Sequence, residues 1–182
     1  MGLDMYLLYR RNLDGIPETA QREMRKQAFI DRWPALVKLY ARGGSLDDAV
    51  DREVDRDIEA NKPYEEVIMR WHKARAINKF FVDNFDPDFV GHYIAIRVTI
   101  DTLKDLVERC EKILASGIDE DGELVDPQGA VELLPTQSRF FFNPNDYDSR
   151  YVDDLKETVK GIKPIVDHPE LYPDLIGYRA WQ

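Results

Sequence analysis

The stretch from residue 91 to residue 117 changes from a strand-like to a helix-like pattern within a few residues. In GHYIAIRV, residues 91–98, β-branched residues occupy one face of an alternating pattern, which is typical of a half-buried strand. Thr99 can then cap a helix over residues 100–117, whose apolar residues recur at helical spacing. This stripe consists of Leu103, Leu106, Val107, Cys110, Ile113 and Leu114. We interpret Cys110 as a small buried apolar residue, not a nucleophile.

The remaining sequence also alternates between strand-like and helix-like segments, with no internal repeat. We expect further strands at residues 3–9, 65–71, 140–142 and 177–181. We expect further helices from Pro17 onward and over residues 46–60, 72–85, 130–135 and 146–166. Interleaved elements of this kind predict an α+β fold, with a small mixed or antiparallel sheet packed against several helices. Residues 1–182 suit a single domain, with an acidic helical insertion at residues 17–61.

Net charge and cysteine content restrict the cellular location and the binding partners that we expect for this protein. The formal net charge of −10 argues against general nucleic acid binding, which requires a basic surface. The single cysteine cannot form an internal disulfide, and no apolar run is long enough to span a membrane. We therefore expect a cytoplasmic protein that does not bind membranes, and the composition also allows a homodimer.

The sequence lacks the patterns that are typical of catalytic and metal sites. His72, His92 and His168 are far apart, and none has a second histidine three or four residues away. The chain contains neither a Gly-x-Ser-x-Gly elbow nor a glycine-rich loop for phosphates. We therefore expect no catalytic residue, no metal and no cofactor.

Basic residues are concentrated in RWHKARAINK, residues 70–79, in an otherwise acidic chain. Trp71 could stack on a planar ligand, Asn78 could recognise its edge, and Lys73 and Arg75 could neutralise a phosphate. The alternative is a surface helix in which the tryptophan belongs to the core and the cations pair with carboxylates. Both interpretations fit the composition.

A second candidate segment is ELLPTQSRFFFNPNDYD, residues 132–148. Here a short polar run precedes three phenylalanines, which would form a central strand with aromatic rings on both faces. Hydroxyl, amide and guanidinium groups would then lie at the mouth of this strand, and Tyr147 could close over a ligand. The polar run consists of Thr136, Gln137, Ser138 and Arg139. The alternative is a turn and a helix cap built from the same residues.

Three segments resemble a family of small proteins encoded by bacteriophages and bacteria. They are MGLDMYL at the start, RWHKARAINKFFVDN in the middle and LLPTQSRFFFNPNDYDSRYVDDLKETV near the end. Trp71, Lys73, Thr136, Gln137 and Tyr147 match the pattern of that family. The sequence departs from the pattern elsewhere, with Arg75 in place of asparagine and Asn78 in place of histidine. The resemblance covers about half the chain and implies membership without implying an activity.

Together, these features favour a non-catalytic binding protein. We expect it to bind a small nucleotide-like or phosphorylated molecule, and the resemblance to phage proteins suggests that it withholds a signal from a bacterial host. The expected ligand-binding residues are Trp71, Lys73, Arg75, Asn78, Thr136, Gln137, Ser138, Arg139 and Tyr147. The alternative is an interaction protein that acts on a host protein through its acidic helical region, and a hydrolase is a third, less favoured interpretation.

Overall fold

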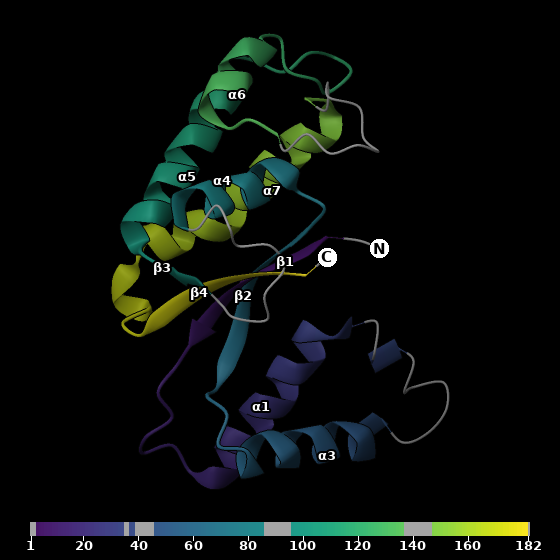
Figure 1. Cartoon of the computed structure of the whole chain (residues 1–182), viewed down its shortest axis with the longest axis vertical. Helices are drawn as coiled ribbons and strands as arrows, with labels where there is room; N and C mark the ends of the chain where they lie inside the picture. The colour runs from purple at the N-terminus through teal and green to yellow at the C-terminus, as the bar shows by residue number, and fades with distance from the viewer. Residues whose placement is uncertain (1–2, 35–36, 39–45, 86–95, 137–146, 182) are drawn as a thin grey trace.

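The fold is built on a four-stranded antiparallel sheet with the strand order β2-β1-β4-β3 (Figure 1). The computed structural model describes residues 3–34, 37–38, 46–85, 96–136 and 147–181. Strands β1 (Asp4–Arg10) and β4 (Leu175–Trp181) pair at the centre of the sheet. Strand β2 (Glu65–His72) pairs with β1, and the short β3 (Ile96–Val98) pairs with β4.

Helices lie on both sides of this sheet, which gives an α+β fold (Figure 1). One side carries α4 (Arg75–Phe85), α5 (Ile100–Leu114), α6 (Pro127–Leu133) and α7 (Ser149–Asp167). The other side carries α1 (Glu18–Arg32) and α3 (Leu46–Glu59), both within the acidic segment 17–61. A 3₁₀ turn, η1 (Pro169–Leu171), precedes β4. No helix among the described residues is long and apolar enough to cross a lipid bilayer.

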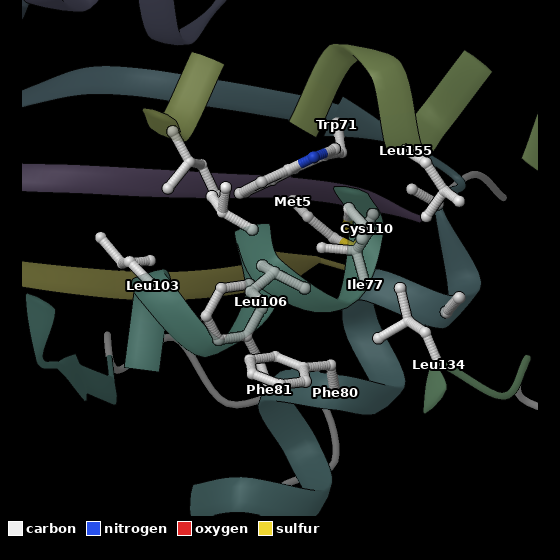
Figure 2. Packing of buried hydrophobic residues seen from close by; sticks show 14 of the residues in the cluster. Met5, Trp71, Ile77, Phe80, Phe81, Leu103, Leu106, Cys110, Leu134 and Leu155 are labelled. Atoms are coloured by element: carbon white, nitrogen blue, oxygen red, sulfur yellow. The ribbon is translucent and has the colours of Figure 1, made fainter. Parts of the chain in front are cut away.

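The main core lies between the sheet and the helices α4, α5 and α7 (Figure 2). On β1, Met5, Leu7 and Tyr9 alternate toward this core, as the period of two requires. Leu106 from α5 and Leu155 from α7 are both fully buried and belong to the same cluster. Burial of these large apolar side chains is the main stabilising contribution to the fold.

The helix predicted after residue 98 is confirmed as α5. Thr99 is its N-cap, because its Oγ1 accepts a hydrogen bond from the Thr102 N–H at 3.2 Å. Cys110 is completely buried in the core, and burial raises the pKa of its thiol to about 12. The thiol therefore stays protonated at neutral pH, in agreement with a packing role.

The predicted helix over residues 72–85 was wrong at its start. Strand β2 continues through His72, which pairs with Asp4 of β1. Lys73 then has a left-handed backbone with φ of 61°, and α4 begins only at Arg75. The predicted strand over 140–142 and the first part of the predicted strand over 91–98 lie outside the described residues.

Helices α1 and α3 pack against each other, here called the α1–α3 unit, and Ala28 of α1 joins a second small apolar cluster with Leu13 and Tyr64. Ion pairs also join the two helices. Lys26 of α1 lies 2.8 Å from Asp51 of α3, which also receives a hydrogen bond from Arg22. Part of the acidic charge of α3 is therefore paired within the unit.

Candidate functional site

The two segments that sequence reasoning selected meet at one cavity of about 230 Å³, here called the α4–α7 cavity. Lys73 and Arg75 line it from the connection between β2 and α4, and Thr136 lines it from the residues after α6. Asp148 and Arg150, at the start of α7, line it as well. The cavity therefore combines groups from three parts of the chain.

Two of the predicted ligand-binding residues lie in the core instead. Trp71 lies among the apolar side chains of the main core (Figure 2). It is 1% exposed, and its indole N–H donates to Thr158 Oγ1 at 2.8 Å. Asn78 is 2% exposed, and its Oδ1 accepts a hydrogen bond from the Tyr178 hydroxyl at 2.7 Å. The indole N–H of Trp71 and the amide oxygen of Asn78 therefore both have hydrogen-bond partners inside the protein. Both side chains contribute to core packing, although Trp71 was expected to stack on a ligand and Asn78 to recognise its edge.

Tyr147 does not line the α4–α7 cavity but contacts two residues that do, and the remaining predicted residues lie outside the described part. The hydroxyl of Tyr147 accepts a hydrogen bond from the Thr136 N–H at 3.3 Å. The Tyr147 ring packs edge-on against Tyr151, with 5.0 Å between ring centroids. Through these two contacts, Tyr147 connects the first turn of α7 to Thr136, which follows α6. Gln137, Ser138 and Arg139 fall outside the described residues.

Lys73 reaches the cavity from an unusual backbone conformation. Its φ of 61° is rare for a residue with a Cβ atom and costs on the order of 1 kcal/mol. A hydrogen bond of 2.7 Å from its N–H to the Leu3 carbonyl oxygen holds this conformation. The turn allows the chain to leave β2 and enter α4 within three residues, so the cation lies directly before the first turn of α4.

Arg150 is a cavity residue that sequence reasoning missed. Its Nη2 donates to the His72 carbonyl oxygen at 3.4 Å, which connects the start of α7 to the end of β2. Arg150 stands in the first turn of the helix predicted over residues 146–166 and was not among the expected ligand-binding residues. Together with Lys73 and Arg75, it gives the cavity three cationic side chains.

Two carboxylates oppose these cations, in different ways. Asp148 is the N-cap of α7, and its Oδ1 accepts a hydrogen bond from the Tyr151 N–H at 3.1 Å. Asp154 lies deeper, and burial raises its carboxyl pKa to about 7, although Arg150 acts in the opposite direction. The nearby carboxylates of Asp148 and Glu157 contribute to the same increase. Near neutral pH, the charge of the cavity therefore depends on the protonation of Asp154.

No protein-family model, curated protein or solved structure matches the chain. The described residues also contain no group of three or more His, Cys, Asp or Glu side chains placed to hold a metal ion.

The raised pKa of Asp154 predicts a specific pH dependence of stability. An unfolded aspartate has a pKa near 3.8, so the folded protein binds an extra proton between about pH 4 and pH 7. The free energy of unfolding should therefore fall as the pH rises through this window. Asp154→Asn should remove this contribution, and urea denaturation at pH 5 and pH 8 should show a smaller loss for the variant than for the wild type. Equal losses of unfolding free energy in the variant and the wild type would contradict the raised pKa of Asp154.

Proposed function

We propose that the protein binds a small phosphorylated molecule, with its phosphate in the α4–α7 cavity. The observation that supports this most strongly is the convergence of Lys73, Arg75 and Arg150 on one cavity in a chain with a net charge of −10. Guanidinium and ammonium groups bind phosphate oxygens through charge-assisted hydrogen bonds. The location of the cations therefore favours an anionic ligand.

The start of α4 supports the same ligand chemistry. Arg75 and Ala76, the first two residues of this helix, both line the cavity. The first turn of α4 contains no acidic side chain, so its partial positive charge is not neutralised from within that turn. Phosphate groups bind favourably at such helix starts, where backbone N–H groups are available.

The size and the polar groups of the cavity suggest how the rest of the ligand is held. A volume of about 230 Å³ suits a phosphate with a few further atoms, so a nucleotide-like ligand would extend outward from it. Thr136 and Asp154 could accept hydrogen bonds from hydroxyl groups of a sugar-like moiety. We further propose that the ligand is held without being converted. The resemblance to phage proteins supports a role in withholding a phosphorylated signal in a bacterial cytoplasm.

Lys73→Gly separates ligand binding from folding. Glycine tolerates φ of 61°, so the variant should be more stable than the wild type by about 1 kcal/mol in the absence of ligand. The loss of a charged hydrogen-bond donor should weaken binding of a phosphorylated ligand by about 10- to 100-fold. Thermal unfolding with a panel of mono-, di- and cyclic nucleotides and inorganic phosphate measures both effects, because a ligand of the folded state raises Tm.

Lys79, six residues further along the chain and within α4, provides a control. Lys79 does not line the cavity and pairs with Asp83 at 2.6 Å. Lys79→Gln should therefore bind the same ligands as the wild type. The proposal fails if no member of the panel raises Tm, or if Lys73→Gly retains the full ligand-dependent increase.

A further inference from the structure

A larger cavity of about 730 Å³ lies on the opposite side of the sheet, here called the arginine cavity. Residues from α1, α3, β1, β2 and β4 line it, so it lies between the α1–α3 unit and the sheet. Its volume is typical of small-molecule sites, which usually measure about 300–1,000 Å³. No local motif in the sequence predicts this cavity.

The lining of the arginine cavity is positively charged, although the protein as a whole is acidic. Five cationic and three carboxylate side chains line it, which leaves a surplus of two positive charges. The cations are Arg10, Arg25, Arg32, Lys62 and Arg179, and the carboxylates are Glu53, Asp57 and Glu65. A cavity whose charge is opposite to that of the whole chain favours an anionic occupant.

Three of the arginines share a single buried carboxylate. The side chain of Glu65 is 8% exposed, and its Oε1 lies 2.7 Å from Arg10 Nη2. Its Oε2 lies 3.3 Å from Arg179 Nη2 and 3.6 Å from Arg32 Nη2. Burial lowers the pKa of Arg32, and the charge of Arg179 acts in the same direction. One carboxylate therefore cannot balance these guanidinium groups, and a second anion would complete the cluster.

The same arginines have unused hydrogen-bond donors. The Nε atoms of Arg10, Arg32 and Arg179 are buried, and none has a hydrogen-bond partner among the described residues. Buried guanidinium nitrogens are normally satisfied, because an unpaired buried donor loses the hydrogen bonds that it makes with water in the unfolded chain. Each of these side chains borders the cavity, so an anion there can approach the cluster directly.

Aromatic side chains form another part of the lining. Phe29 and Trp33 come from α1 and its C-cap, and the largely buried Tyr64 precedes β2. Aromatic faces bind flat rings, while arginines bind phosphate oxygens through paired N–H groups. We propose that the arginine cavity binds a nucleoside phosphate, with the phosphate on the arginines and the base against the aromatic side. This site is independent of the proposed function of the α4–α7 cavity.

A fluorescence titration tests this assignment directly. AMP, ADP, adenosine and inorganic phosphate are titrated into the whole protein while tryptophan emission is recorded. We expect AMP or ADP to quench emission and to bind at least about tenfold more tightly than adenosine or phosphate, because only the nucleotides contact both parts of the lining. Trp33 lines the cavity, whereas Trp71 is buried on the other side of the sheet, so Trp33 should contribute to the quenching and Trp71 should not. Trp33→Phe should reduce the quenching but retain binding in calorimetry.

Two arginine variants separate recognition from charge. Arg32→Lys keeps the charge near Glu65 but loses the forked donors, and it should weaken nucleotide binding at least about tenfold. Arg52 is an exposed arginine of α3 that does not line the cavity, and Arg52→Lys should change the affinity less than twofold. Circular dichroism verifies that both variants are folded.

Several results would overturn the assignment to the arginine cavity. They are the absence of nucleotide binding in both assays, unchanged affinity in Arg32→Lys, and preferential binding of an oligonucleotide over AMP and ADP. Nucleotide binding that is lost in Lys73→Gly but unchanged in Arg32→Lys would place the ligand in the α4–α7 cavity instead. Failure of the Lys73→Gly experiment alone leaves the titration of the arginine cavity unaffected, so the two proposals are tested separately.

Discussion

Trp71→Ala is expected to lower the free energy of unfolding by about 3–5 kcal/mol, which is the usual cost of removing a large buried aromatic side chain. The indole is 1% exposed and lies 6.1 Å from the Phe81 ring, measured between ring centroids. Its removal leaves a cavity in the main core and also removes the donor to Thr158. Urea denaturation measures the loss, provided that the variant still folds.

Trp71→Phe is a more conservative substitution at the same position. It retains most of the apolar volume and should cost about 1–2 kcal/mol, mainly because Thr158 Oγ1 loses its donor. Thr158 keeps its own hydrogen bond to the Asp154 carbonyl oxygen at 2.6 Å. Nearly unchanged stability in both variants, together with loss of ligand binding, would show that Trp71 is a ligand-stacking residue and contradict its placement in the core.

Glu65→Gln is expected to lower the free energy of unfolding by about 2–3 kcal/mol in the absence of anions. Removing one side of a buried charge cluster usually costs about 3–5 kcal/mol, and the partial exposure of the arginines reduces this value. Sodium phosphate should restore part of the lost stability relative to sodium chloride at equal ionic strength, because phosphate can occupy the arginine cavity. Denaturation curves in the two salts measure both effects.

The neighbouring glutamate provides a control for this experiment. Glu66 has a side chain that is 30% exposed, and its ion pair with Arg11 is 3.9 Å long. Glu66→Gln should therefore cost less than about 1 kcal/mol and should show no specific response to phosphate. Similar losses for Glu65→Gln and Glu66→Gln would contradict the description of Glu65 as the shared counter-ion.

The elements that sequence reasoning located best have strong local periodicity. The α5 stripe and the alternation of β1 are visible in the residues themselves, because each element buries one continuous face. The boundary between β2 and α4 was misplaced because it depends on pairing with a distant strand. Asp4 pairs with His72, so β2 continues into a segment whose composition looked helical.

Prediction of the candidate sites from the sequence was limited in a similar way. Lys73 and Arg75, which were selected from the local chemistry around residues 70–79, line the α4–α7 cavity, but that chemistry could not show which face of each element was buried. Asn78 was assigned to a ligand because its partner, Tyr178, is a hundred residues away in sequence. The arginine cavity was missed entirely, since Arg10, Arg32 and Arg179 come from three remote segments and no sequence window contains them together.

The strand order β2-β1-β4-β3 has a consequence for how the chain reaches its native state. Each of the three strand pairings joins segments that have at least one helix between them, so none of the pairings among the described strands is a hairpin. Long loops must close before these pairings form, which slows folding. During synthesis, β1 can pair with β2 on one edge, but its other edge has no partner until β4 leaves the ribosome. The strand order therefore leaves one edge of the central strand open until β4 has been synthesised, and open strand edges in nascent chains favour aggregation.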